Sequence, residues 1–323
     1  MNKYILKRLL GMIPVLLGIT IVSFAIIHLA PGKPTTLDQA LNPKVSPEVR
    51  LRMVQLYGLD KPLAAQYLEW VKRLCVLDLG KSFSDNRPVL DKILERIPLT
   101  VAINFFSLVF VFLVAIPMGI KASLKPGKGF DNFTTFLAFI LFAMPTFWLA
   151  LLLMQVFCIS FGWLPISGIK SLDFEYFSFP HKLWDLTWHL ILPVFVSSLG
   201  SLAVISRYMR SSMIEALSQP YIYTARAKGL PERAVVYKHA LRNACLPIVT
   251  VVGLSIPGLL GGSVIFESIF ALPGLGRLFY DAVMMRDYPL IMAEVVLGAV
   301  LTMLGNLIAD ISYAYVDPRI RYK

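Results

Sequence analysis

The short run Gly80-Lys81-Ser82 is the part of the sequence closest to a nucleotide-binding motif. A phosphate-binding loop has a glycine five residues before its second glycine, and Cys75 occupies that position here. No His-Glu-x-x-His or Gly-x-Ser-x-Gly pattern occurs, and the histidines are scattered along the chain. The other cysteines, Cys158 and Cys245, complete neither a metal-ligand spacing nor a disulfide framework. The sequence therefore predicts a chain that is not an enzyme and that holds no metal.

The stretch from Tyr221 to Asn243 is polar and basic, and it separates two long hydrophobic runs. Residues 221–228 are good helix formers, and Gly229 can adopt the left-handed conformation that ends a helix. Pro231 suits the first turn of a second helix, with Glu232 close to its N-terminus. The stretch predicts two short helices joined by a sharp stop, a rigid handle that a soluble partner can grip. The alternative is a basic loop that only orients the protein in the membrane.

Composition predicts a membrane protein. Hydrophobic residues make up 57% of the 323 residues and charged residues only 16%, against about a quarter in soluble domains. Six windows contain no charged residue or a single one, and each supplies the roughly 20 residues that a bilayer core requires. No alternation typical of a β-barrel appears, so we predict an all-α polytopic protein with six transmembrane helices. The windows are residues 9–32, 97–120, 132–169, 186–206, 243–266 and 288–309.

The net charge of +11 follows the predicted topology and does not indicate a nucleic-acid partner. The short outer loops, 161–187 and 267–289, hold two Lys or Arg residues each, whereas the loop 207–243 holds seven. This asymmetry predicts that the loop 207–243 and both termini are cytoplasmic. The predicted parts are a cytoplasmic tip with the first helix (1–30), an extracytoplasmic helical insert (31–97), a membrane core (98–314) and a cytoplasmic tail (315–323).

The predicted insert contains two helical patterns. In the first, Ser46 caps a helix that has Pro47 at its first position. The second is an amphipathic pattern over Pro62–Leu77. The insert either caps the outer face of the membrane part or provides a docking surface for a protein that delivers the substrate.

Two predicted spans contain residues that bend or interrupt helices. The third span, Phe133–Phe161, has a proline near its centre, and the fifth, Cys245–Phe266, is rich in glycine and proline. A proline inside a span removes a backbone hydrogen bond and bends the helix, and small residues four apart allow close packing. These positions either line the path of a solute or serve ordinary helix packing. The candidate gate and path residues are Met144, Pro145, Phe147, Pro257, Gly258 and Gly262.

Several of these stretches together resemble one protein family. Thr224–Leu230 and His239–Asn243 are similar to the cytoplasmic coupling ("EAA") loop of ABC-importer permeases, in the version of the dipeptide and oligopeptide branch. The general EAA pattern is met only in part, because Tyr223 replaces its Glu, Thr224 its first Ala, and Arg242 the Pro of its tail. The segments YGLDKPLAAQYLEWVKRL, PGLGR and DPRIR are also similar to B-type members of this branch. The resemblance covers essentially the whole chain.

The resemblance implies the type I ABC-importer permease fold and a location in a bacterial or archaeal plasma (inner) membrane. It implies three kinds of partner in addition to membrane lipid: a second homologous permease subunit, two cytoplasmic ATPase subunits and an extracytoplasmic substrate-binding protein. It implies no cofactor in this chain, because ATP and Mg²⁺ bind the ATPase subunits. It also implies that the handle couples the permease to the ATPase. The implied coupling residues are Tyr223, Thr224, Ala225, Arg226, Ala227, Lys228 and Gly229.

Di- or oligopeptides are the solute that the resemblance implies, and nickel chelates, glutathione and short oligosaccharides are the alternatives carried by similar systems. An ion-coupled secondary transporter is a further alternative. Coupled transport usually requires charged residues inside the membrane, and here Glu294 and Asp310 lie toward the ends of the sixth predicted helix. We therefore expect the driving energy to reach the chain from outside, through the handle.

Overall fold

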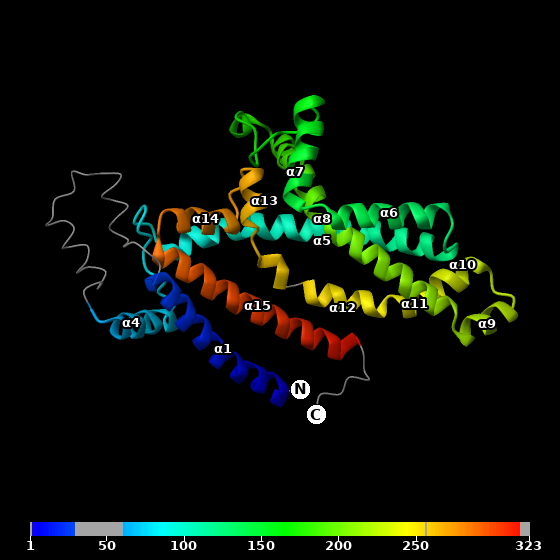
Figure 1. Cartoon of the computed structure of the whole chain (residues 1–323), viewed down its shortest axis with the longest axis horizontal. Helices are drawn as coiled ribbons and strands as arrows, with labels where there is room; N and C mark the ends of the chain where they lie inside the picture. Colours follow the sequence, from blue (N-terminus) through cyan, green and yellow to red (C-terminus); the bar gives the residue numbers. More distant parts are fainter. Residues whose placement is uncertain (1, 30–60, 256, 317–323) are drawn as a thin grey trace.

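The computed structural model describes residues 2–29, 61–255 and 257–316 of the chain (Figure 1). Over these residues the chain is helical, and its β contact is an isolated bridge between Lys81 and Pro88. The predicted all-α class is confirmed. The predicted helix that begins at Ser46 and the DPRIR segment lie outside the described residues.

The long elements are α1 (Asn2–Leu29), α4 (Leu63–Cys75), α5 (Val89–Leu124), α6 (Gly129–Ala143), α7 (Thr146–Met154), α8 (Phe179–Leu217), α9 (Pro220–Ala227), α12 (Leu246–Ser255), α14 (Leu275–Met284) and α15 (Tyr288–Val316). Shorter elements connect them: η1 (Gln155–Ser160), η2 (Phe174–Tyr176), α10 (Glu232–Ala234), η3 (Val235–Ala240), α11 (Leu241–Ala244), η4 (Pro257–Leu260) and α13 (Val264–Ile269). Helix α4 corresponds to the amphipathic pattern predicted over Pro62–Leu77.

Four of the described helices, α1, α5, α8 and α15, are long and apolar enough to cross a membrane. The pair α6 and α7 with η1 counts as a fifth span if the two bent parts are taken together. Helices α5, of 36 residues, and α8, of 39 residues, extend well past the roughly 20 residues of a bilayer core, so parts of both lie outside the hydrocarbon. Six spans with cytoplasmic termini remain a prediction.

The predicted third span is not one bent helix, because the chain turns by 103° between α6 and α7. Helix α6 ends at Ala143, and Met144 adopts an extended conformation with φ −85° and ψ 131°. A residue before proline is pushed out of the helical region by the proline ring, and Pro145 has no N–H to continue the ladder. Pro145 is therefore the point where the helix stops and restarts.

The predicted fifth span, Cys245–Phe266, is also interrupted. Helix α12 ends at Ser255, the turn of 3₁₀ helix η4 follows at Pro257–Leu260, and α13 begins at Val264. Prolines and glycines at this place supply few helical hydrogen bonds and permit a tight path of the backbone. The sequence predicted one span over Cys245–Phe266 with residues that bend or interrupt helices, and the structure shows separate helical pieces in place of one helix.

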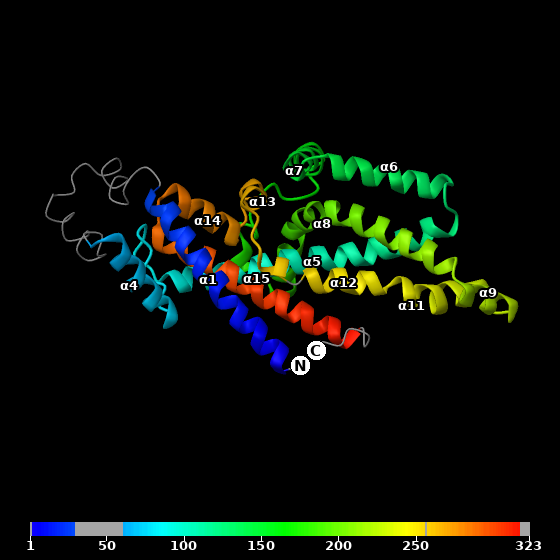
Figure 2. The ribbon, with the colours of Figure 1, turned by 60° about the horizontal axis from the view of Figure 1, so that its bottom comes forward.

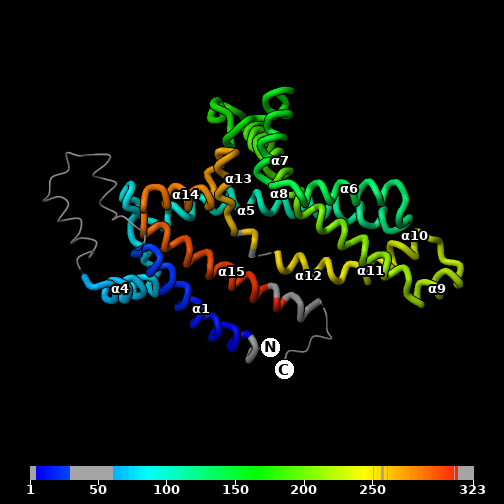
Figure 3. Tube along the Cα trace, in the orientation of Figure 1, coloured from blue at the N-terminus to red at the C-terminus, as the bar shows by residue number. Residues whose placement is uncertain are grey.

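The helices form an elongated bundle, as Figures 1, 2 and 3 show. Helices α5 and α8 pack along one another, α6 lies against α8, and α1 runs beside α15. Helix α9 occupies one end of the bundle and α4 the opposite end (Figure 1). Arg8 near the start of α1 pairs with Asp310 near the end of α15 at 2.9 Å, so these two helix ends lie together.

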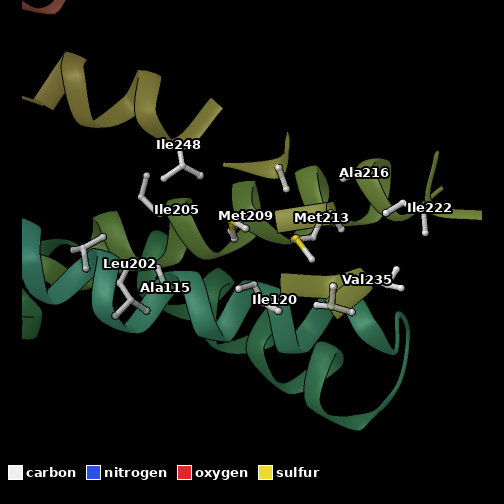
Figure 4. Close-up of a cluster of buried hydrophobic side chains, with 14 of the residues drawn as sticks. Ala115, Ile120, Leu202, Ile205, Met209, Met213, Ala216, Ile222, Val235 and Ile248 are labelled. Atoms are coloured by element: carbon white, nitrogen blue, oxygen red, sulfur yellow. The ribbon is translucent and has the colours of Figure 1, made fainter. Parts of the chain in front are cut away.

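The buried apolar side chains form separate clusters along the bundle. The largest, which we call the handle core, joins α5 and α8 to α9, η3 and α12 (Figure 4). A second cluster joins α7, α8 and α13 near the interrupted spans, and a third joins α1, α5, α14 and α15 at the end that carries α4. The labelled members of the handle core are Ala115, Ile120, Leu202, Ile205, Met209, Met213, Ala216, Ile222, Val235 and Ile248.

Candidate functional site

Helix α9 is the first half of the predicted helix-stop-helix, and its end has the geometry of a Schellman motif. Gly229 has φ +73°, in the left-handed region. Its N–H donates to the carbonyl of Arg226 at 2.9 Å, and the N–H of Leu230 donates to the carbonyl of Ala225 at 3.4 Å. These two bonds satisfy carbonyl groups that a helix end otherwise leaves without donors. The predicted stop at Gly229 is confirmed.

The second half of the handle is a continuous helical run through α10, η3 and α11. Pro231 has φ −63° and ψ 140° and precedes this run as its N-cap, one position before the first turn in which the sequence placed it. Glu232 is the first helical residue, where its negative charge faces the positive end of the helix dipole. Val235 and Val236 in η3 are buried in the handle core, which fixes the second half on the membrane helices.

The side chains of α9 divide between the handle core and the surface. Ile222 is fully buried, and Ala225 is buried three residues later on the same face. Ala225, one of the implied coupling residues, therefore packs against its own chain and lies on the inward face of α9. Tyr223, with 60% of its surface exposed, lies on the opposite face. The other exposed members of the predicted coupling set are Thr224, Arg226, Ala227, Lys228 and Gly229.

Arg226 has a partner within the handle. Its Nε donates to Glu232 Oε2 at 3.1 Å, and its Nη2 donates to Glu232 Oε1 at 2.6 Å. The hydrogen bond from Arg226 holds the pKa of Glu232 below its ordinary value, so the carboxylate is charged at neutral pH. The pair bridges the Gly229 stop and fixes the angle between the two halves of the handle.

A cavity of about 430 Å³ lies where the two interrupted spans meet α5 and α8. Thr146 and Phe147 line it just after the turn at Pro145, and Ser263 lines it just before α13. Both helix breaks therefore border the same cavity. Its remaining lining residues are Thr100, Ile103, Asn104, Ser197, Ile265, Phe266 and Glu267, so hydroxyl, amide and carboxyl groups face an otherwise apolar space.

Asn104 on α5 holds the interruption of the fifth span. Its Nδ2 lies 3.2 Å from the carbonyl oxygen of Gly258, 3.0 Å from that of Leu259 and 3.0 Å from that of Gly261. Backbone that leaves a helix at membrane depth needs other donors and acceptors, because lipid offers none. The Asn104 amide supplies donors to these carbonyl groups, of which that of Gly258 also accepts from the N–H of Gly261 at 3.1 Å.

Glu267 on α13 is 3% exposed and gathers donors from three places. It accepts from the N–H of Ser263 at 3.2 Å, from the N–H of Arg277 at 2.9 Å and from the hydroxyl of Thr100 at 3.5 Å. Thr100 in turn accepts from the N–H of Leu275 at 2.9 Å. A buried carboxylate is stable only when its oxygens are hydrogen-bonded. Glu267 thus ties the PGLGR segment to α5 and to the break before α13.

The structure brings the candidate gate residues to two neighbouring places. Met144 and Pro145 form the turn before the polar cavity, Phe147 lines that cavity, and Asn104 links it to Gly258. Pro257 begins η4. Gly262 packs on the backbone of Gly276 and lines a second cavity of about 410 Å³.

Glu294 lines the second cavity, among apolar side chains of α5, α14 and α15. Its Oε1 atom is buried and has no hydrogen-bond partner among the described residues. The sequence placed Glu294 near a helix end, and the structure puts it in the second turn of α15. An isolated polar residue inside a predicted span was the available signal for Asn104 and Glu294, and the sequence did not indicate what faces them, while Glu267 lies just beyond the fifth predicted span.

Replacing Asn104 with alanine is expected to lower the stability of the permease by about 1–3 kcal/mol, because carbonyl groups of the break lose their donor. The thermal unfolding temperature of the detergent-extracted protein measures this loss. Asn132→Ala is the matched control, since Asn132 also donates to a backbone carbonyl, that of Gly127 at 3.1 Å, but is exposed. Equal unfolding temperatures for the two variants would show that Asn104 does not hold the break.

The chain matches two models of protein families. The model described as binding-protein-dependent transport system inner membrane component matches residues 112–322, and the model of the N-terminal part of such components matches residues 1–104. The oligopeptide transport system permease protein AppB of Bacillus subtilis is 45% identical over 323 residues, 100% of both chains. The dipeptide transport system permease protein DppB of Escherichia coli K12 is 39% identical over 339 residues, again 100% of both. The glutathione transport system permease protein GsiC of Salmonella typhimurium is 40% identical over 323 residues, also 100% of both.

Proposed function

Because the chain belongs to the family of binding-protein-dependent transport system inner membrane components, we propose that it forms one half of a path for di- and oligopeptides. The chain is a multi-pass permease subunit of an ATP-driven importer in the inner membrane, and this subunit is not catalytic. The names of the oligopeptide and dipeptide relatives support a peptide as the solute. The polar cavity at the two helix breaks supports a path at that place.

The packing of α9 against the membrane helices supports a mechanical role for the handle. Ile222 and Ala225 place one face of α9 in the same core as α5 and α8, while Tyr223 and its neighbours remain exposed. A force applied to the exposed face of α9 must therefore move α5 and α8 as well. A loop that only oriented the protein would need no buried face.

The proposed cycle uses the handle as the point of contact with the ATPase. The exposed face of α9 sits in a groove of a cytoplasmic ATPase subunit, and closure of the ATPase pair on ATP moves the handle. The membrane helices follow and change the access to the cavity at the helix breaks. Switching of this kind is a re-docking of rigid elements between two arrangements, and the driving energy comes from ATP bound elsewhere.

The partners in this proposal are a second homologous permease subunit, two ATPase subunits that hold ATP and Mg²⁺, and an extracytoplasmic substrate-binding protein. The family description, which names a binding-protein-dependent system, supports the last of these. The insert over residues 31–97 is proposed as a docking surface for the binding protein, with α4 as its described helix.

The experiment that tests this function is uptake into proteoliposomes that contain the complete importer, supplied with its binding protein and ATP. We expect accumulation of a labelled tripeptide, with no accumulation when ATP is omitted. Glutathione is the second candidate solute, because a relative named for its transport is 40% identical to this chain. Accumulation of glutathione and not of the tripeptide would replace the peptide assignment and leave the importer assignment standing.

Arg226→Ala and Glu232→Ala are expected to differ in their effects on uptake. If the pair only fixed the handle, either change would remove the same exposed ion pair, worth roughly 0–1 kcal/mol. We propose that Arg226 also contacts the ATPase, so Arg226→Ala should lower peptide uptake by the complete importer several-fold more than Glu232→Ala. Uptake that falls equally in both variants would limit Arg226 to a role inside the handle.

A further inference from the structure

Asp131 lies in the first turn of α6, is 2% exposed, and is surrounded by donors from α8. Arg210 donates to it from Nε to Oδ1 and from Nη2 to Oδ2, both at 2.5 Å. Arg207 donates from Nη1 to Oδ1 at 3.3 Å and to the hydroxyl of Thr135 at 2.7 Å. The N–H of Gly127 donates to Oδ2 at 2.8 Å. A bidentate Arg–carboxylate pair fixes the relative orientation of the two side chains as well as their distance. We call this group the α6 clamp.

The α6 clamp is the charged attachment of α6 to α8, beside the short loop 125–128 and the Lys121–Phe130 contact that link α6 to α5. The buried residues of α6 are Asp131, Thr134 and Ala138, so the apolar packing of this helix is small. Its large side chains point away from the bundle, and Phe142 near its end is 74% exposed. The other outward phenylalanines are Phe133, Phe136 and Phe139.

The partner side of the clamp belongs to the body that carries the handle. A methyl group on Gly119 of α5 would lie 2.7 Å from Met209 Cβ and 2.7 Å from the carbonyl oxygen of Ser206, so the α5 and α8 backbones are in direct contact beside Arg210. Met209 is fully buried in the handle core, which also contains Ile222 of α9. Helices α5, α8 and α9 therefore move together, and Asp131 joins α6 to α8 in addition to the loop 125–128 that links α6 to α5.

The far end of α6 leads to the turn at Pro145. Helix α6 spans about 22 Å, from the clamp to Ala143. Beyond the turn, Ala150 and Met154 of α7 are anchored in a different cluster, with Phe266 of α13. A displacement of α6 by the clamp is therefore taken up at Met144 and Pro145, where no helical ladder resists it.

We propose that Asp131 is a positioning residue for transport: it transmits the movement of the handle through α6 to the bend that borders the polar cavity. This role rests on the proposed coupling of α9 to an ATPase. Because the carboxylate binds Arg210, α6 follows α8, and the movement reaches Phe147 on the far side of the bend. A neutral side chain of the same shape removes the charge and leaves the Arg210 guanidinium, 19% exposed, without its counter-ion.

The test is Asp131→Asn in the complete importer, with uptake and ATP hydrolysis measured on the same proteoliposomes. Uptake is expected to fall roughly tenfold or more, the effect of losing a charge-assisted hydrogen bond, while hydrolysis stimulated by the loaded binding protein stays within about twofold. Glu175→Gln is the matched control, because Glu175 pairs with Lys170 at 2.7 Å but is exposed and lies outside the handle. Equal ratios of uptake to hydrolysis in the Asp131 variant and the control would overturn the proposal.

A distance measurement separates this role from a general loss of structure. Spin labels at Phe142→Cys on α6 and Leu124→Cys at the end of α5, with Cys75, Cys158 and Cys245 replaced by serine, report whether α6 follows the handle body. The distance should stay narrow and unchanged when ATP is trapped, and should broaden in Asp131→Asn. A distribution that stays narrow in that variant would overturn the proposal.

If Asp131→Asn does not assemble into the importer, Arg210→Lys is the second variant to test. It keeps the positive charge and loses the bidentate geometry. That variant is expected to assemble and to lose several-fold in uptake per ATP hydrolysed. Normal uptake per ATP in Arg210→Lys would overturn the proposal. If the unmodified importer hydrolyses ATP without moving any tested solute, the proposed function fails while the spin-label distance still tests the α6 clamp.

Discussion

Gly229→Val is expected to uncouple ATP hydrolysis from solute uptake in the complete importer. Gly229 has φ +73°, and an L-residue in this region costs roughly 1–2 kcal/mol, with a further penalty for a β-branched side chain. The nearest way to relieve this strain is to open the turn and change the angle between α9 and the run that begins at Glu232. Uptake should then fall roughly tenfold while the ATPase subunits continue to hydrolyse ATP.

The measurement is the number of solute molecules taken up for each ATP hydrolysed. Gly229→Asn is the matched control, because asparagine tolerates the left-handed region better than other residues with a Cβ atom. No other atom lies within 4 Å of a methyl group placed on Gly229, so the valine variant tests backbone angle and not crowding within the chain. A valine variant that transports with unchanged coupling would remove Gly229 from the coupling mechanism.

Gly262→Ala is expected to prevent the permease from reaching a stable fold. A methyl group there would lie 2.8 Å from the Cα atom of Gly276, and closer still to its amide nitrogen. Gly276 is equally crowded, because a methyl group there would lie 2.6 Å from the carbonyl carbon of Ser263. Backbone cannot yield as a flexible side chain can, so the cost should reach or exceed the roughly 1–3 kcal/mol typical of overpacking.

The yield of monodisperse, detergent-extracted permease and its unfolding temperature measure this effect. Gly200→Ala is the control, because a methyl group on Gly200 of α8 meets no atom within 4 Å and alanine favours a helix. We expect the Gly200 variant to match the unmodified permease and the Gly262 variant to be lost or strongly destabilised. A Gly262 variant of normal yield and unfolding temperature would mean that the backbone before α13 does not pack tightly against the PGLGR segment.

The class of protein could be predicted from the sequence because its signals are local. Long windows without charge predict spans, and the left-handed stop at Gly229 follows from a glycine placed after a run of helix formers. The inward face of α9 was also readable, since Ile222 and Ala225 are three residues apart. The resemblance marked Ala225 as a coupling residue but did not indicate that its side chain lies in the core of its own chain.

The shape of the interrupted spans could not be read from the sequence. A proline such as Pro145 predicts a bend, but the angle of 103° depends on where α7 finds its packing partners, in the cluster around Phe266. The amide of Asn104 donates to Gly258, 154 residues away, and the hydroxyl of Thr100 donates to Glu267, 167 residues away. The pair of Asp131 and Arg210 is likewise separated by 79 residues, so only the fold brings them together.

The central claim is that ATP bound by neighbouring subunits, acting through the handle, drives this permease. Glu294 is the residue that an ion-coupled mechanism would use, because its carboxyl oxygen is buried in the membrane part without a described partner. The most direct measurement is therefore solute accumulation in vesicles with an imposed proton or sodium gradient, with and without the ATPase subunits. We predict accumulation only with the ATPase, the binding protein and ATP, regardless of the gradient. Accumulation by the permease alone under an ion gradient would contradict this account.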